Sequence, residues 1–197
     1  MKLNYATSNV GKVRSLQRYF NGTSVEISPL NIDLPEPRSD DLREIARAKV
    51  VHAYNHINSP VVALDAGFFV HSLNGFPKAF VNFALSTIGL EGILKLAEGK
   101  EKGCEFRDCL AYLDSECDGP VYFVSGTMGM LSAGIRGTKM DYHWSELSRI
   151  FIPEGCDKTL AEMNEDEFKL WNSSKRQSSS KSFAEWYLGW NGATKLL

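Results

Sequence analysis

The chain has 197 residues, of which 43% are hydrophobic, and its 22 basic and 24 acidic residues give a formal net charge of −2. This size fits one domain, or one domain with a small lobe, and the apolar content is enough for a real core. The nearly balanced charge excludes a surface that coats nucleic acid, because binding the phosphate backbone takes many uncompensated cations. No apolar run reaches membrane-spanning length, and the chain begins directly with a strand-like segment, so the sequence predicts a cytoplasmic protein.

Residues 3–12 begin as an alternating, strand-like segment and continue through small polar residues into a helix. The alternation ends at Ala6, and helical spacing begins just after Lys12. The turn between them therefore opens a helix N-terminus, where backbone N–H groups have no intrahelical partner and favour an anion. Gly11 lets a phosphate come close, and Lys12 supplies a full positive charge. The pattern indicates an anion site.

A helix cap is the competing interpretation of this turn. Ser8 or Asn9 caps a helix as readily as it helps to bind phosphate, and these residues alone favour neither interpretation. The turn lacks the spaced glycines of a P-loop and of a dinucleotide-binding fingerprint, so neither of these common phosphate motifs applies.

A second strand is predicted for residues 25–30, and an extended segment stiffened by two prolines follows it. Glu36 stands between these prolines, so its backbone is held rigid. An acidic residue in such a place is usually part of a solvated loop, but a rigid carboxylate also suits Mg²⁺, which takes one or two carboxylates plus waters. From Asp40 or Asp41 onward the apolar residues recur at helical spacing, with Lys49 near the border of the apolar face.

Residues 60–70 form an apolar run that contains one carboxylate, Asp65. Such a run is typical of a central strand, and an Asp at its end lies where open α/β sheets bind ligands. A turn that Asp65 forms with Gly67 is a serious alternative. Burying a carboxylate between Leu64 and Phe68 costs free energy unless a cation or several hydrogen-bond donors pair with it. This cost favours a functional role for Asp65.

The rest of the chain changes in character along its length. Residues 80–98 predict one or two helices, whereas residues 104–131 predict strands around a turn at residues 118–120, most simply an antiparallel hairpin or meander. The polar tract at residues 172–181 has the composition of a disordered linker. Residues 183–197 predict a C-terminal helix that packs on the body.

Several short blocks, taken together and in this order, resemble the inosine triphosphatase family. Each block is a weak motif by itself, but their common order along nearly the whole chain is specific. The blocks are residues 7–12, 33–36, 44–49, 64–67, 74–77, 87–96, 136–138, 150–155 and 159–163.

The resemblance implies an α/β fold with an elongated mixed β-sheet and flanking helices, two lobes around a central cleft, and commonly a homodimer. Residues 1–197 would then form a single domain, with one lobe of approximately residues 1–100 plus the C-terminal helix and another of residues 104–155. The implied reaction is the Mg²⁺-dependent hydrolysis of inosine, deoxyinosine or xanthosine triphosphate to the monophosphate and pyrophosphate, which sanitises the nucleotide pool.

The resemblance also implies roles for individual residues. Asp65 would be catalytic, activating the attacking water, and Glu36 and Asp65 would bind the metal. Such a set is chemically coherent, since the phosphates need neutralising charge and the water needs a base or a metal. The residues implied in substrate binding are Thr7, Ser8, Asn9, Val10, Gly11, Lys12, Lys49, Ala66, Lys169, Lys175 and Arg176.

The chain departs from the family pattern mainly where the base is read. After residues 136–138 the family's base-reading loop is replaced by residues 139–144, and the expected Ser-His-Arg stands as Ser174, Lys175 and Arg176. The lysine expected before it is matched only loosely by Lys169.

The metal site also differs in part. Where the family has two acidic residues followed by Ser and Gly, this chain has Leu64, Asp65, Ala66 and Gly67, so one carboxylate and one hydroxyl are missing. Two interpretations remain open: a pyrophosphatase with family-like or shifted base preference, and a catalytically weak nucleotide-binding protein of the same fold.

Overall fold

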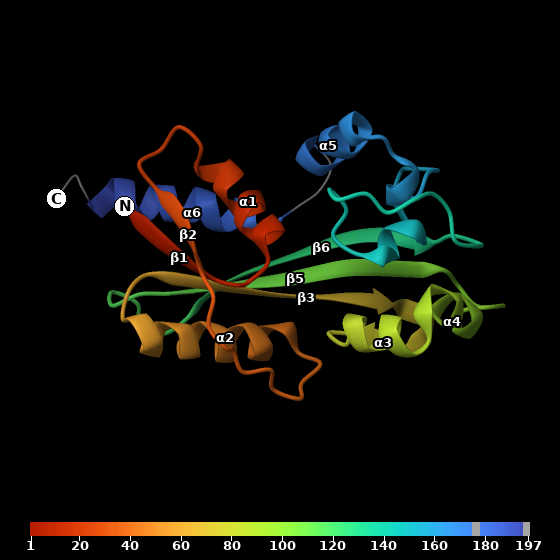
Figure 1. The fold of residues 1–197 in the computed structure, drawn as a ribbon, viewed down its shortest axis with the longest axis horizontal. Helices are drawn as coiled ribbons and strands as arrows, with labels where there is room; N and C mark the ends of the chain where they lie inside the picture. Colours follow the sequence, from red (N-terminus) through yellow and green to blue (C-terminus); the bar gives the residue numbers. More distant parts are fainter. Residues whose placement is uncertain (175–177, 195–197) are drawn as a thin grey trace. The chain divides into compact units, whose positions relative to one another are not determined.

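The computed structural model describes residues 1–174 and 178–194. Its strands are β1 (Lys2–Ala6), β2 (Glu26–Leu30), β3 (Val61–Val70), β4 (Pro77–Lys78), β5 (Gly103–Leu113), β6 (Val121–Leu131) and β7 (Phe151–Pro153). They form a seven-stranded sheet in the order β2-β1-β3-β5-β6-β7, with β4 paired to β3 (Figure 1). β1 is parallel to β2 and β3, whereas β4 is antiparallel to β3 and β7 to β6, so the predicted mixed sheet is confirmed.

Helices precede, separate and follow these strands. The α-helices are α1 (Val10–Gln17), α2 (Leu42–Ile57), α3 (Val81–Thr87), α4 (Gly89–Leu96), α5 (Glu165–Ser174) and α6 (Ser179–Thr194). The short 3-10 helices are η1 (Arg18–Phe20), η2 (His71–Leu73), η3 (Glu146–Arg149) and η4 (Leu160–Glu162). In the part of the chain that the structure describes, no helix is both long and apolar enough to cross a membrane.

The chain divides into two compact units, each with its own core. Unit 1 contains Met1–Asp65, Asp108–Ser125 and the described residues from 178 onward, and unit 2 contains Ala66–Arg107 and the described residues from 126 to 174. The strands β3, β5 and β6 contribute residues to both units.

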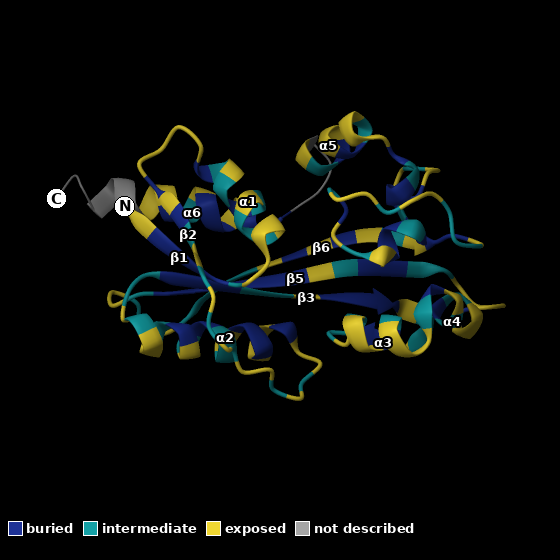
Figure 2. Cartoon of the chain, viewed as in Figure 1, coloured by how far each residue is buried: buried dark blue, intermediate teal, exposed yellow. Residues whose placement is uncertain are grey.

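The core of unit 1 lies between its part of the sheet and two helices. α1 and α6 cover one face of these strands and α2 covers the other (Figure 1). The rings of Tyr112 and Phe183 pack with centroids 5.5 Å apart, which fixes α6 against β5. α2 buries only the side that faces the strands, as its apolar spacing predicts (Figure 2). The buried residues of this core are Leu3, Tyr5, Leu16, Phe20, Val25, Ile27, Val62, Leu110, Tyr112, Phe183, Ala184 and Tyr187.

The core of unit 2 is rich in aromatic side chains. Phe168 and Trp171 face inward from α5 with ring centroids 5.8 Å apart, while the rest of that helix is mostly exposed (Figure 2). Phe68 and Phe151 extend the cluster from β3 and β7. These contacts explain why α5 forms at the edge of a polar tract.

Two sequence predictions are corrected by the structure. Asp65 does not end its strand, because β3 continues to Val70 and pairs there with β4. Asp65 lies instead beyond the end of the neighbouring β1, whose last pairing with β3 joins Tyr5 and Val62. The polar tract at residues 172–181 is helical up to Ser174 and again from Ser179, because flanking aromatic residues pack on both cores.

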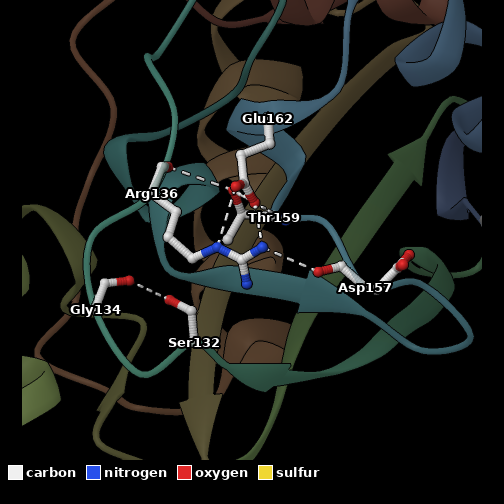
Figure 3. A network of polar contacts seen from close by, with 6 residues as sticks. All are labelled: Ser132, Gly134, Arg136, Asp157, Thr159 and Glu162. Atoms are coloured by element: carbon white, nitrogen blue, oxygen red, sulfur yellow. Dashed lines mark hydrogen bonds and ion pairs between the residues drawn. The ribbon is translucent and has the colours of Figure 1, made fainter.

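A polar network in unit 2 ties residues 136–138 to η4 (Figure 3). The Arg136 guanidinium contacts the Glu162 carboxylate through Nε at 3.1 Å and Nη2 at 2.9 Å, and Nη2 also donates to the Asp157 carbonyl. Glu162 accepts the backbone N–H of Thr159 at 2.8 Å as well. Gly137 lies inside this network with φ +72°, and a Cβ there would stand 2.4 Å from the Ala161 carbonyl oxygen.

Gly137→Ala is therefore expected to lower the free energy of unfolding by about 3 kcal/mol, combining left-handed backbone strain with steric overlap. Gly155→Ala is the matched control, because Gly155 has the same φ of +72° but nothing within 4 Å of the added Cβ. Urea unfolding should show a loss of only about 1 kcal/mol in the control. Equal losses in the two variants would show that the close approach at Gly137 is unimportant.

Candidate active site

The turn between β1 and α1 is open to solvent and capped by Asn9. The Asn9 side chain accepts the backbone N–H of Lys12 at 3.2 Å, and the backbone N–H of Asn9 donates to the Thr7 hydroxyl at 3.1 Å. Ser8, Asn9, Val10 and Gly11 are exposed. Asn9 therefore caps α1, and an anion site at this turn stays a prediction. The exposed turn leaves the positive end of the helix dipole facing solvent, as an anion site requires.

Lys12 is half-buried in the first turn of α1. Burial lowers the pKa of its ammonium group, and the charge of Lys49 adds to this effect. Three carboxylates act in the opposite direction, Asp65 most strongly, then Asp108 and Glu36. A bound phosphate would also favour the charged ammonium, so anion binding and protonation of Lys12 support each other.

Lys49 of α2 joins the two predicted metal ligands. Its Nζ lies 2.7 Å from Asp65 Oδ1 and 3.6 Å from Glu36 Oε1. The side chains of Lys49 and Asp65 are only 12% and 13% exposed, whereas that of Glu36 is 82% exposed. Lys49 thus supplies the cation that a carboxylate in an apolar strand requires. These residues and residues 7–12 all belong to unit 1.

The donor set of Glu36 and Asp65 fits Mg²⁺. Among residues 1–174 and 178–194, no group of three or more His, Cys, Asp or Glu side chains is placed to hold a metal ion. Mg²⁺ does not need such a group, because it commonly takes one or two carboxylates and completes its shell with waters and substrate phosphates. Two hard carboxylate oxygens beside a candidate phosphate turn meet this requirement.

The other predicted binding residues lie in unit 2 or outside the described residues. Ala66 follows Asp65 on β3 and is exposed. Lys169 lies on α5, where its Nζ is 2.7 Å from Glu165 in an i,i+4 ion pair on the helix surface. Lys175 and Arg176 fall outside the described residues. The contribution of these four residues to a nucleotide site stays a prediction.

Residues 139–144, which replace the family's base-reading loop, are packed in unit 2. The Tyr142 hydroxyl donates to the Met163 carbonyl at 3.1 Å, and the Trp144 ring meets Phe168 with centroids 5.7 Å apart. His143 is buried, and its Nδ1 accepts the backbone N–H of Met140 at 2.9 Å, so Nε2 carries the proton of the neutral ring.

Burial lowers the pKa of His143, and the positive charge of Lys139 lowers it further. A hydrogen bond with the Leu160 backbone raises this pKa but does not cancel the shift. As the pH falls, His143 is therefore protonated near pH 6.5 in the unfolded chain and only at a lower pH in the folded chain. We expect stability from His143 to be complete above that pH and to be lost as the pH falls toward the lowered pKa. Urea unfolding at pH 5 and 7.5 should show a smaller pH-dependent loss for His143→Gln than for the wild type or for His52→Gln, at an exposed position. An equal loss in all three proteins would contradict this role.

One buried polar pair in unit 1 is not predicted from the sequence. Asp108 on β5 accepts the Ser125 hydroxyl of β6 at 2.8 Å, and both residues are buried. The available signal was a charged residue in the alternating series with Leu110 and Tyr112, where a buried face of the strand is expected.

Residues 3–186 match the sequence model of the Ham1 family. The chain belongs to the Ham1 family. Among its relatives, a dITP/XTP pyrophosphatase of Methanopyrus kandleri is 35% identical over 189 residues, covering 95% of this chain and 96% of that protein. One from Pyrococcus horikoshii is 36% identical and covers 94% and 96%. The inosine triphosphate pyrophosphatase 1 of Trypanosoma cruzi is 32% identical and covers 84% and 83%.

Solved structures support the same fold. The Ham1 protein of Staphylococcus aureus superposes with a TM-score of 0.80 at 19% identity, covering 97% of this chain and 100% of that one. A HAM1 protein of Coxiella burnetii gives a TM-score of 0.77 at 17% identity and covers 96% and 99%. The predicted relation to the inosine triphosphatase family is therefore confirmed by the family match, and the predicted α/β class by the structural neighbours.

Proposed function

We propose that this protein hydrolyses deaminated purine nucleoside triphosphates, such as ITP, dITP and XTP, to the nucleoside monophosphate and pyrophosphate. The observation that carries the proposal is the group formed by Lys49, Asp65 and Glu36, in the same unit as the Thr7–Lys12 turn. The relatives named dITP/XTP pyrophosphatase agree with it. In this role the protein removes damaged nucleotides from the cellular pool.

The proposed mechanism assigns each charge in unit 1 a task. The Thr7–Lys12 turn and Lys49 bind the triphosphate, since backbone N–H groups and ammonium groups neutralise its oxygens. Asp65 accepts a proton from the attacking water, whose oxygen forms the new bond to the α-phosphorus. The bond between the α-phosphorus and the bridging oxygen breaks, and pyrophosphate leaves with that electron pair.

Glu36 and Asp65 are proposed to hold Mg²⁺. When bound, the ion supplies positive charge to the phosphates and lowers the pKa of a coordinated water. The Nζ of Lys49 lies within 4 Å of both carboxylates, so its charge limits their mutual repulsion.

A shifted base preference is the second candidate, and the observation in its favour is the segment of residues 139–144. Tyr142 and His143 are engaged with Met163 and Met140, and Trp144 packs on Phe168. A segment rebuilt in this way discriminates bases by different contacts, because specificity follows from the donors and acceptors that meet the base edge. A catalytically weak nucleotide-binding protein is the remaining alternative.

A substrate screen with detection of released pyrophosphate separates these possibilities. We expect Mg²⁺-dependent release of one pyrophosphate per ITP, dITP or XTP, with slower release from ATP and GTP. Preferential release from another nucleotide would establish a shifted preference. Tight nucleotide binding without release would favour the binding protein. We further propose a cytoplasmic homodimer, which light scattering and fractionation test.

A further inference from the structure

Asp108 is a buried carboxylate of unit 1 that the proposed mechanism does not use. The residue is 8% exposed, and it lies on β5 two residues before Leu110 and four before Tyr112. Both of these residues belong to the core that α1 and α6 cover. Since side chains two residues apart share one face of a strand, Asp108 lies on this face as well.

Ser125 fixes the orientation of this carboxylate from the next strand. Its hydroxyl donates to Asp108 Oδ1 at 2.8 Å. Phe123, two residues earlier on β6, packs against the same core, which places Ser125 on the same face of the sheet. A charge-assisted hydrogen bond of this kind, made between buried partners, holds an acceptor in one geometry.

Lys12 points toward the same face from α1. Leu16 follows it by one helical turn and is fully buried in the core, and residues four apart lie on the same side of a helix. Tyr5, at the end of β1, is 1% exposed on this face too. The charge of Asp108 acts on both groups: after burial it raises the pKa of Tyr5, and it opposes the lowering of the Lys12 pKa.

We propose that Asp108 is a positioning residue for the anion-binding turn: held by Ser125, it keeps the ammonium of Lys12 oriented for a triphosphate. On the α2 side of the sheet, Asp65 accepts a hydrogen bond from Lys49 at 2.7 Å. The inference rests on the proposed function only in naming the triphosphate of the substrate as the bound anion. Asp108 itself touches neither substrate nor reacting atoms.

If Asp108 supports the ammonium of Lys12, its charge sets the pH at which the Thr7–Lys12 turn stops binding an anion. Among the residues that the structure describes, the charged groups that act on Lys12 are Asp65, Asp108, Glu36 and Lys49. Removing the charge of Asp108 weakens the support for the ammonium form, so Lys12 loses its proton at a lower pH. The anion affinity of the turn then declines at a lower pH too. A purely structural role for Asp108 predicts no such shift.

Calorimetric titration of the full chain with inorganic tripolyphosphate, from pH 7 to pH 10.5, tests the proposal. For Asp108→Asn we expect the alkaline decline in affinity to move down by about one pH unit or more. An NMR titration of the Lys12 side chain should move in parallel. Asp114→Asn is the matched control. It also removes the charge of a carboxylate in unit 1 that accepts a hydroxyl hydrogen bond, here from Tyr112 at 2.5 Å. The control should keep the wild-type profile.

An unchanged alkaline decline and an unchanged Lys12 titration in folded Asp108→Asn would overturn the proposal. Should that variant fail to fold, Ser125→Ala decides, since it keeps the charge and removes only the hydroxyl donor. Ser125→Ala should move the alkaline decline in tripolyphosphate affinity to lower pH, but by less than Asp108→Asn does. An unchanged decline would contradict the positioning role of Asp108. Neither the calorimetric nor the NMR titration needs turnover. If the protein had no pyrophosphatase activity but Asp108→Asn still moved both titrations, only the proposed function would be refuted, and the role of Asp108 would stand.

Discussion

Asp65→Asn is expected to lower the turnover of a triphosphate substrate by at least about a hundredfold, the scale of a lost general base. Asn keeps the shape of the side chain and an oxygen that accepts from Lys49, now 2.7 Å from Asp65. It removes both the charge proposed to hold Mg²⁺ and the group proposed to accept the proton. Steady-state release of pyrophosphate measures the effect, and the melting temperature should change little.

Asp114→Asn provides the matched control for the loss of turnover. Asp114 lies in unit 1 but follows β5, and its carboxylate accepts the backbone N–H groups of Glu116 and Cys117. This variant should turn over substrate at nearly the wild-type rate. Near-normal turnover in folded Asp65→Asn would remove Asp65 from the chemistry.

Lys12→Met is expected to raise KM for every nucleoside triphosphate by about 10- to 100-fold, the range for losing a hydrogen bond to a charged group. The side chain keeps its length and loses its charge, and an ammonium in the turn senses the phosphates and not the base. Lys49→Met should act on all substrates alike for the same reason. KM values for purine and pyrimidine triphosphates, compared with those of the exposed-site variant Lys2→Met, measure the effect. A changed preference between bases would contradict the assignment.

The family and the fold class follow from the sequence because many short motifs stand in a fixed order. Residues 7–12 are predicted as a strand-to-helix turn, and the structure places them between β1 and α1. The need of Asp65 for a cation is likewise predicted from its apolar neighbours, and Lys49 meets it. In these cases the physical cause is local, so pattern and propensity are enough.

The features that the sequence misses depend on contacts between distant segments. β3 continues past Asp65 because β4 pairs with its end, and no local pattern records that pairing. Asp108 meets Ser125 only because β5 and β6 are neighbours in the sheet. The polar tract is helical up to Ser174 and from Ser179 because Phe168 and Phe183 anchor its flanks in two separate cores. The composition of the tract does not reveal that aromatic residues on either side of it pack into these cores.

In the proposed reaction, water attacks the α-phosphorus and pyrophosphate leaves as one group. Hydrolysis of dITP in ¹⁸O-labelled water, followed by mass spectrometry of both products, tests it directly. We predict equal amounts of dIMP and pyrophosphate, with the label in dIMP alone and with its incorporation slowed at least about a hundredfold in Asp65→Asn. Label in pyrophosphate, or release of dIDP with orthophosphate, would contradict this account.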